Sequence, residues 1–373
     1  MIAKLLPNRV RRTYLGGGRI DAFCGTTGRA RSPSAPSGGR GATALPDMPM
    51  PEDWMASTTT AFNGTLEIEG EGLGRLEDGR LVKDVVGTLP ILVKLLDSDE
   101  RLVIQAHPTV PCAKRLFNSP VGKTECWYFL DGTAPDACVY LGFKPGITRE
   151  AWEKAVRAGI EDGRQPVSDS RNIEKSKCRS ACRTSHIACQ NPHTDAQERV
   201  PPELLSFLHR IPVKAGDFVF VDGGMPHAIG GGCFMIELQE PSDLMVVAER
   251  VTPSGRRIPD AKMHGGVGWE KMFEVYEYEG RTLEETCARY VRCAVETAVP
   301  VTKILGPELT NKFSMWRVAG GGILPLPRDR AVAVVTEGAG EVNGLAVKKG
   351  DRLVVADEQQ LAVTDAATLI VCA

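Results

Sequence analysis

Two histidines stand where apolar segments end, and both could serve as metal ligands. His107 closes the apolar run at 101–108 (RLVIQAHP), and His227 lies in the glycine-rich stretch 222–232, between two predicted strands. Because alternate side chains of an extended segment project from one face, Gln105 shares a face with His107. Imidazole nitrogens and amide oxygens both bind divalent cations, so these three residues form the first part of a candidate site.

Two further predicted strands add charged side chains to this set. Lys123, Glu125 and Trp127 share one face of their strand, and Glu237 and Gln239 project together from another. Two imidazoles, a carboxylate and an amide suit zinc or another divalent cation and leave room for water or substrate. The alternative is that each histidine is a hydrogen-bonded part of the scaffold, which is a common role for this residue.

The elements that must position these residues are predicted to be mostly short strands. The 39 glycines and 25 prolines exceed the average content of turn residues, which favours many short strands over a helical bundle. We predict strand and turn throughout 62–145, and again from 301 to the last residue. An amphipathic helix is predicted over 148–164 with Thr148 as its N-cap, and a second helix begins at the capping box of Thr282. The remaining predicted strands lie at 211–224 and 233–240.

One internal repeat indicates that a β unit is duplicated. The segment VKAGDFVFV at 213–221 is echoed by VKKGDRLVV at 347–355. Each copy places a tight Gly-Asp turn before a strand with apolar residues at period two. Chance is the alternative, but two copies in β-rich surroundings favour a duplicated barrel or jelly roll. Since the last histidine is His264, only the first unit could bind a metal through histidine.

The composition excludes several classes of protein. The chain has 373 residues, and Lys+Arg 45 against Asp+Glu 47 provides no basic surplus for binding nucleic acid. Its apolar runs are far shorter than the ~18 residues that a membrane span needs. The 11 cysteines are an odd number, and we expect no secretory signal, so we predict mostly reduced thiols in a cytoplasmic protein. The Arg-rich, acid-poor residues 1–45 leave an organelle transit peptide as an open alternative.

Three segments resemble, in order, the signature segments of type I mannose-6-phosphate isomerase, particularly its short bacterial form. They are QAHP at 105–108, GKTECWY at 122–128 and HAIG at 227–230, with supporting matches at 8–21, 51–58 and 239–243. The resemblance spans most of the chain. It implies a mainly β fold with two cupin-type jelly-roll β-barrels, a small helical segment and an inserted loop. It also implies an aldose–ketose isomerase that interconverts mannose 6-phosphate and fructose 6-phosphate through a cis-enediol(ate).

The same resemblance implies roles for individual residues. One zinc ion would be held by His107, Glu125, His227 and Gln105. Lys123 would lie beside the metal, where it could stabilise the enediolate oxygen or relay a proton. Glu237 and Asp243 match acidic positions that line the pocket, and both are eligible as the base. The plain alternatives are a solvated strand lysine for Lys123 and a turn former for Asp243.

Two positions depart from the pattern of the family. Relatives usually carry a catalytic Arg four residues after the Asp of the Ser-Asp motif, but this chain has Val247. The nearest arginine, Arg250, is expected to face away, because its offset from 247 is odd. Position 11 is Arg where relatives usually have Trp. Loss of a cation that stabilises transition-state charge costs ~10²–10³ in rate, so the alternatives are weak activity, another sugar or sugar phosphate as substrate, or a non-catalytic metal- or sugar-phosphate-binding cupin.

We expect four regions along the chain. They are an N-terminal arm with a Gly/Ser/Pro/Arg-rich loop (1–50), a metal-binding cupin domain (51–250), a connecting helical segment (251–300) and a second cupin-like β-domain without metal (301–373). The loop itself covers 26–46, and 165–200 is predicted to be an insertion. That insertion contains a cluster whose spacing is not that of a standard zinc finger, so we favour a flexible segment over a second zinc site: Cys178, Cys182, His186, Cys189 and His193.

The expected partner is a small sugar phosphate, and no nucleic acid or membrane is expected. Its phosphate needs cationic or N–H donors. Lys114, Arg115 and Lys144 are near the candidate site in sequence, but each is better explained as an ordinary surface charge. The sequence leaves the oligomeric state open.

Overall fold

The computed structural model describes residues 1–25, 50–63, 68–162, 202–293 and 299–373. The loop predicted at 26–46, the insertion predicted at 165–200 and its cysteine–histidine cluster lie outside the described residues. Within the described ranges, no helix combines the length and the apolar character that crossing a bilayer requires.

Most described elements are strands, and every pairing between them is antiparallel. A six-stranded sheet has the order β1 (Ile2–Lys4), β20 (Arg352–Ala356), β17 (Arg330–Glu337), β22 (Thr368–Cys372), β15 (Met315–Ala319), β14 (Val301–Leu305). A seven-stranded sheet has the order β13 (Val291–Arg292), β9 (Phe218–Val221), β6 (Glu125–Phe129), β11 (Cys233–Gln239), β4 (Leu92–Ser98), β3 (Glu52–Met55), β2 (Arg9–Val10). The mainly β fold predicted from the sequence is confirmed.

Three smaller sheets complete the strands. A five-stranded sheet has the order β12 (Val246–Val247), β5 (Gln105–Ala106), β10 (His227–Ile229), β7 (Cys138–Phe143), β8 (Leu208–Pro212). Two short hairpin-like sheets pair β16 (Ile323–Pro325) with β21 (Gln360–Ala362), and β18 (Ala339–Val342) with β19 (Leu345–Lys348). Among the described residues, none of these strand orders closes on itself.

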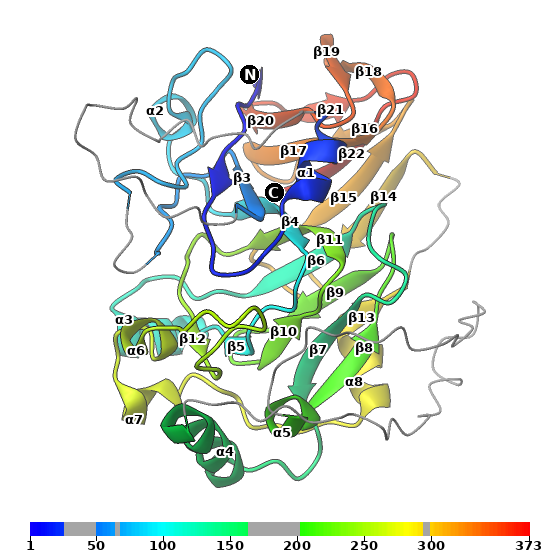
Figure 1. Ribbon diagram of the computed structural model, residues 1–373. Coiled ribbons are helices and arrows are strands. Elements are labelled where there is room, and N and C mark those ends of the chain that lie inside the picture. Colours follow the sequence, from blue (N-terminus) through cyan, green and yellow to red (C-terminus); the bar gives the residue numbers. More distant parts are fainter. Residues whose placement is uncertain (26–49, 64–67, 163–201, 294–298) are drawn as a thin grey trace.

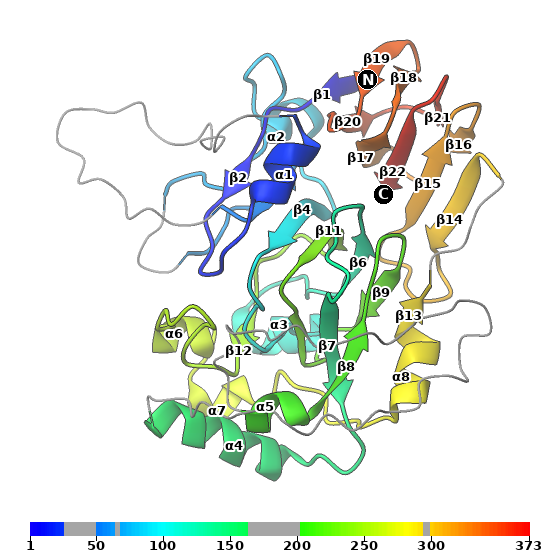
Figure 2. The same cartoon turned by 45° about the vertical axis from the view of Figure 1, so that its right-hand side comes forward.

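Eight helices lie in the described ranges: α1 (Gly18–Phe23), α2 (Val82–Val86), α3 (Val110–Phe117), α4 (Arg149–Asp162), α5 (Pro202–Ser206), α6 (Asp260–Met263), α7 (Trp269–Met272) and α8 (Leu283–Tyr290). In Figures 1 and 2, α4, α5 and α7 lie at the end of the molecule opposite the C-terminal strands β14 to β22. Trp152 of α4 is fully buried in a cluster with residues of the five-stranded sheet, so α4 covers the outer face of that sheet.

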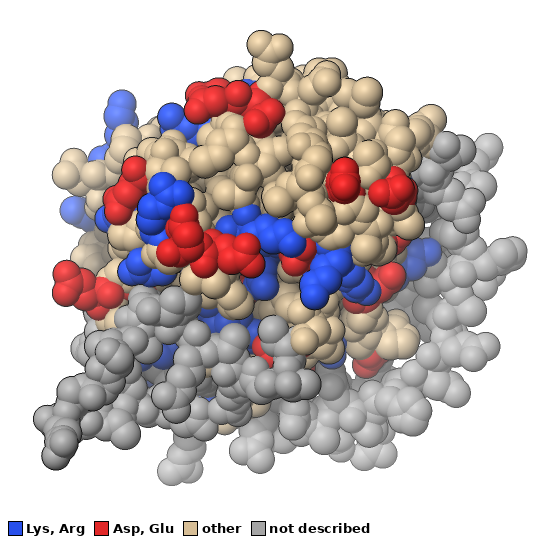
Figure 3. Space-filling model, turned by 90° about the horizontal axis from the view of Figure 1, so that it is seen from above, with Lys and Arg blue, Asp and Glu red and all other residues tan. Residues whose placement is uncertain are grey.

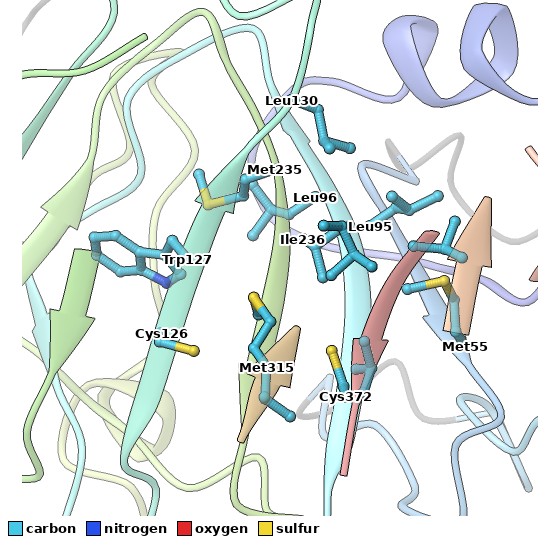
Figure 4. Packing of buried hydrophobic residues seen from close by; sticks show 14 of the residues in the cluster. Met55, Leu95, Leu96, Cys126, Trp127, Leu130, Met235, Ile236, Met315 and Cys372 are labelled. Carbon is cyan, nitrogen blue, oxygen red and sulfur yellow. The ribbon is translucent and has the colours of Figure 1, made fainter. Parts of the chain in front are cut away.

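The seven-stranded sheet lies between the five-stranded sheet and the C-terminal sheet. Alternation sends neighbouring side chains of β6 to opposite sides. In Figure 4, Cys126 points toward Met315 and Cys372 of the C-terminal sheet, whereas Trp127 points the other way. Leu95 and Ile236 fill the same apolar layer as Cys126. One face of this sheet therefore closes the core, and the other face is left for the candidate site.

The sequence repeat builds the same turn twice. Asp217 Oδ2 accepts the backbone N–H of Lys214 at 3.0 Å, and Asp351 Oδ2 accepts that of Lys348 at 3.1 Å. The glycine before each aspartate has a positive φ, +84° and +89°, which a residue without a Cβ adopts without strain. Each turn leads into a strand, β9 or β20. The structural match agrees with duplication of a β unit.

Both predicted helices are present, but the region predicted as strand and turn also contains helices. The helix predicted at 148–164 is α4, and Thr148 Oγ1 accepts the N–H of Ala151 at 3.2 Å as its cap. The capping box at Thr282 is present at the start of α8. The prediction of strand and turn throughout 62–145 was wrong at α2 and α3. Thr109 caps α3, a proline occupies its first turn and Asn118 ends it in the left-handed conformation, which are helix signals that outweighed the β-rich surroundings.

The surface above the C-terminal sheets carries both signs of charge. Figure 3 shows acidic and basic side chains interspersed on this face, among a larger uncharged area. On that face the described side chains form no broad field of a single sign.

Candidate metal centre and its pocket

The structure brings His107, Glu125 and His227 together from three separate strands. One ligand atom from each lies within 4.8 Å of the others, and their exposed fractions are 0%, 1% and 0%. Glu125 stands between the two histidines: its Oε2 is 3.2 Å from Nε2 of His107, and its Oε1 is 3.3 Å from Nε2 of His227. These residues are 18 to 120 positions apart in the chain, so only the stacking of the sheets brings them together.

Hydrogen bonds on the far side of each ring fix which nitrogen faces the glutamate. His107 Nδ1 lies 2.9 Å from the carbonyl oxygen of Leu244, and His227 Nδ1 lies 2.9 Å from that of Met225. Because a carbonyl can only accept, each Nδ1 must carry the proton. Both Nε2 atoms of the neutral rings therefore present a lone pair toward Glu125, as metal-binding histidines do.

Burial keeps the two rings neutral, whereas neighbouring side chains keep the carboxylate charged. Burial lowers the pKa of His227 to about 3, against the opposing effect of Glu125. Burial and the Lys123 ammonium lower the pKa of His107. For Glu125, burial alone would raise the pKa, but Lys123 and the two histidines hold it well below its usual value.

The donor atoms fit a cation. The Nε2 lone pairs of His107 and His227 face the carboxylate oxygens of Glu125 at 3.2 and 3.3 Å. Since all of these atoms are hydrogen-bond acceptors, a positive ion between them would stabilise the arrangement. Lys123 Nζ already lies 2.7 Å from His107 Nε2 and 2.8 Å from Glu125 Oε2. In the described part of the chain, His227 Nε2 is buried without a hydrogen-bond donor. Such an orphaned acceptor in a His₂Glu set indicates a metal ligand.

Sheet register aligns the fourth predicted ligand with this group. In the five-stranded sheet, His227 is the direct partner of Gln105, which is in turn the partner of Val247. Directly opposed residues of antiparallel strands project from the same face. Gln105 therefore lies beside His227, next to an apolar wall formed by Val247.

A second row crosses the seven-stranded sheet. Trp54, Lys94, Glu237 and Trp127 are successive partners on β3, β4, β11 and β6. Lys94 Nζ donates to Glu237 Oε1 at 2.7 Å, and both side chains are almost fully buried. Burial raises the pKa of Glu237, although Lys94 opposes this. The row places a carboxylate with a raised pKa two residues along the strand from the glutamine that pairs with Glu125.

Asp243 is held in place by contacts from the N-terminal part of the chain. Its Oδ1 lies 3.2 Å from an Arg12 nitrogen, and its Oδ2 accepts the N–H of Phe62 at 2.9 Å. Burial would raise the pKa of Asp243, but Arg12 and Lys94 keep it below its ordinary value. Arg12 also contacts Glu52 at 3.0 Å.

A single cleft connects these groups. Its lining includes the predicted residues Gln105, Lys123, Glu237 and Asp243, and also Val247. His107, Glu125 and His227 lie behind Lys123, outside the lining of the cleft. Lys123 connects them to the cleft, because it lines the cleft and contacts His107 Nε2 and Glu125 Oε2. The structure thus places all seven predicted site residues around one site.

Comparisons with known proteins agree with this picture. No family model matches the chain. The probable mannose-6-phosphate isomerase GmuF of Bacillus subtilis (strain 168) is 30% identical over 154 residues, which are 41% of this chain and 35% of that protein. The mannose-6-phosphate isomerase ManA of the same organism is 26% identical over 270 residues, 71% of this chain and 69% of that protein. Over these stretches the chain is similar to bacterial mannose-6-phosphate isomerases.

Solved structures show that the fold is shared over the whole length. The crystal structure of mannose 6-phosphate isomerase from Bacillus subtilis matches with a TM-score of 0.60 at 18% identity, over 100% of this chain and 99% of that one. A mutant of phosphomannose isomerase from Salmonella typhimurium matches with a TM-score of 0.65 at 14% identity, over 100% and 98%. The resemblance to type I phosphomannose isomerases predicted from the sequence is confirmed.

The positions that depart from the pattern of these isomerases lie at and beside the cleft. Val247 is 1% exposed and forms part of the wall of the cleft. Arg250 faces away, as expected: it donates to the carbonyl of Ile258 at 3.1 Å and contacts Asp260. The reason differs from the one expected, because β12 ends at Val247 and strand alternation does not extend to 250. Arg11 pairs with Glu71 at 2.8 Å.

The three basic residues considered for the phosphate lie outside the cleft. Lys114 and Arg115 are exposed on α3, and Arg115 pairs with Glu274. Lys144 is likewise not part of the lining. Their interpretation as surface charges agrees with these positions.

Sequence reasoning missed several polar residues of the cleft: Arg12, Tyr14, Glu52, Lys94 and Lys262. For Lys94 a signal was present, because it is the single charge inside the apolar run PILVKLL at 90–96. A lysine in a buried strand requires a carboxylate partner. Glu237, already singled out on other grounds, is that partner.

Proposed function

We propose that the chain is a zinc-dependent aldose–ketose isomerase that interconverts mannose 6-phosphate and fructose 6-phosphate through a cis-enediol(ate). The observation that carries the proposal is the convergence of His107, Glu125 and His227 behind a cleft lined by Lys123 and Glu237. The names of the homologues support the substrate, since they are mannose-6-phosphate isomerases.

The chain's own side chains would hold one zinc ion. We assign His107, Glu125 and His227 as ligands and Gln105 as the fourth, since register places it beside His227. When bound, the ion would polarise the substrate carbonyl and stabilise negative charge on oxygen. A His₂Glu set with one further oxygen donor suits zinc.

We assign proton transfer between C1 and C2 to Glu237. A general base works best when its pKa lies near the working pH, and burial raises the pKa of this carboxyl. Asp243 is the weaker candidate, because Arg12 and the N–H of Phe62 occupy its two oxygens and its pKa is lowered. We therefore give Asp243 the role of positioning Arg12 at the cleft.

Lys123 reaches the cleft with a cationic group. Its ammonium lies 2.8 Å from Glu125 Oε2 and lines the cleft. A cation at this point would stabilise the enediolate oxygen or return a proton to it. It would supply part of the positive charge that an arginine at position 247 would otherwise provide.

We further propose that the seven- and five-stranded sheets within 51–250 carry all of the chemistry and that the β-domain at 301–373 binds no metal. The protein would act in the cytoplasm on a small-molecule partner.

Purified full-length protein tests the proposal. It should interconvert the two sugar phosphates, lose activity when a chelator removes the metal and regain it with zinc. The His107→Ala, His227→Ala double variant should bind no zinc and show no turnover. Glu237→Gln should retain zinc but lose about 10²–10⁴-fold in kcat. Full activity in the double histidine variant would refute the assigned site, and turnover of a different sugar alone would refute the assigned substrate.

A further inference from the structure

Five basic side chains line the cleft of the candidate site. They are Arg12, Lys94, Arg101, Lys123 and Lys262. A buried or half-buried cation is normally matched by a carboxylate, so the partners of these five residues show which of them is available to a ligand.

Four of the five cations have partners at short range. Arg12 contacts Glu52 and Asp243, Lys94 contacts Glu237, Arg101 forms a two-point contact with Glu249 at 2.9 Å, and Lys123 contacts Glu125. Lys262 differs from them. In the described ranges its ammonium takes part in no hydrogen bond and no ion pair.

Packing holds Lys262 at the rim of the cleft. It lies on α6, where the next residue, Met263, is fully buried against Val247 and Ile258. Arg250 fixes the beginning of this helix from below, because it donates to the carbonyl of Ile258 and contacts Asp260. The apolar Val247 on the wall of the cleft is therefore part of the contact that brings the ammonium of α6 to the substrate side.

We propose that Lys262 binds the phosphate group of a sugar phosphate in this cleft. The inference rests on the proposed function for the identity of the ligand, and on the unpaired ammonium for its location. A phosphate monoester has a second pKa near ~6 and is mostly a dianion at neutral pH. It would give Lys262 the anionic partner that the other four cations of the cleft already have.

The surroundings of Lys262 agree with this role. Burial and the nearby Arg12 guanidinium lower its pKa to about 8, partly opposed by Asp243, Glu52 and Glu71. The side chain is thus still an ammonium at neutral pH, but its charge is poorly stabilised by the protein alone. An arriving dianion would relieve this deficit, and each charged hydrogen bond of this kind changes affinity about ten- to hundredfold.

The test compares Lys262→Met, Lys262→Arg and a control, Lys271→Met, which removes an exposed lysine of α7 outside the cleft. Binding of fructose 6-phosphate is measured by calorimetry, and competition by inorganic phosphate is measured in parallel. Lys262→Met should weaken fructose 6-phosphate binding about ten- to hundredfold, and phosphate should no longer compete. Lys262→Arg should retain most of the affinity, and the control should match the unmodified chain. Thermal unfolding verifies that each variant is folded.

The outcomes separate this inference from the proposed function. If Lys262→Met binds fructose 6-phosphate as tightly as the unmodified chain, the inference is wrong, whether or not the protein is an isomerase. If binding depends on Lys262 but neither sugar phosphate is converted, the inference stands and the proposed function fails. In an active enzyme, Lys262→Met should raise KM and leave kcat nearly unchanged, which a merely structural role in α6 would not produce.

Discussion

The interior of the C-terminal region, between the six-stranded sheet and the two small sheets, is filled by apolar side chains. They include five fully buried residues: Val335, Leu353, Val355, Leu361 and Leu369. The interior between the seven- and five-stranded sheets has the same repeat turn at its edge, but it contains buried charges beside its apolar side chains. Glu125, Lys94 and Glu237 are each at most 3% exposed there.

The difference shows where the chain gives up stability for a site. Burying ions costs several kcal/mol for each one, which pairing only partly offsets. A sheet interior filled with Val and Leu avoids this cost, as the C-terminal region does. The first interior is therefore expected to be the less stable of the two and the one that carries the chemistry. The two regions share the turn that leads into a strand, but the side chains that fill their interiors differ.

The largest expected effect comes from removing the charge at the centre of the first interior. Glu125→Gln takes away the only carboxylate of the triad, so we expect loss of bound zinc and a fall in kcat/KM of about 10³-fold. Glu337→Gln, the same change at an exposed position at the end of β17, is the matched control and should have no effect. Zinc content and isomerase kinetics measure both. Equal activity of the two variants would contradict the contrast between the regions.

A change in the second interior should affect stability alone. Leu369→Ala creates a cavity in the apolar core, and we expect the free energy of unfolding to fall by about 2–5 kcal/mol. Because no residue of that core lines the cleft, kcat/KM of the folded protein should not change. Denaturant unfolding and kinetics at low temperature make the comparison. A loss of kcat in a fully folded Leu369→Ala protein would show that the two regions are coupled.

An arginine at position 247 should lower the stability of the protein. Val247 packs against Ile258 and Met263, so Val247→Arg must displace α6 or bury a charge, at a cost of about 1–3 kcal/mol. We expect no gain in kcat/KM, since Lys123 and Lys262 already bring positive charge to the cleft. Val299→Arg at a 55% exposed position is the control. A large gain in isomerase rate from Val247→Arg would mean that the missing cation is a defect.

The smallest predicted effect is a pH dependence of binding. As pH rises through about 8, Lys262 loses its proton, so affinity for fructose 6-phosphate should fall, by about tenfold at pH 9. The charged groups around it do not titrate in this window, because the pKa of Asp243, Glu52 and Glu71 is lowered and that of Arg12 is raised. Titration calorimetry from pH 7 to 9 measures this. Lys262→Arg should show a flat profile, and an equally flat profile in the unmodified chain would contradict the pKa argument.

The sequence singled out the candidate ligand residues but not the network around them. His107, Glu125 and His227 could be selected because polar residues at strand ends have a limited set of roles, and a family resemblance linked them. Arg12 and Lys262 could not, because each comes to the cleft from a distant segment and neither has a local pattern that marks it. Their positions depend on how β12 and the N-terminal residues pack, which no short-range periodicity encodes.

Helix α3 shows the corresponding limit for the fold. The sequence contains its capping residues Thr109 and Asn118, yet strand and turn were predicted for the whole of 62–145 because the surrounding segments are strand-like. Strand lengths were also overestimated: the run at 101–108 contributes only the two-residue strand β5. Alternation still placed Gln105 correctly beside the site, because one pair of register partners is enough to set the face.

Anomalous diffraction at the zinc absorption edge, from crystals of the full chain grown with zinc, tests the central claim most directly. We predict one strong peak about 2 Å from the Nε2 atoms of both His107 and His227 and from a carboxylate oxygen of Glu125. A zinc ion found only at other side chains, or no peak between these three residues, would contradict the account.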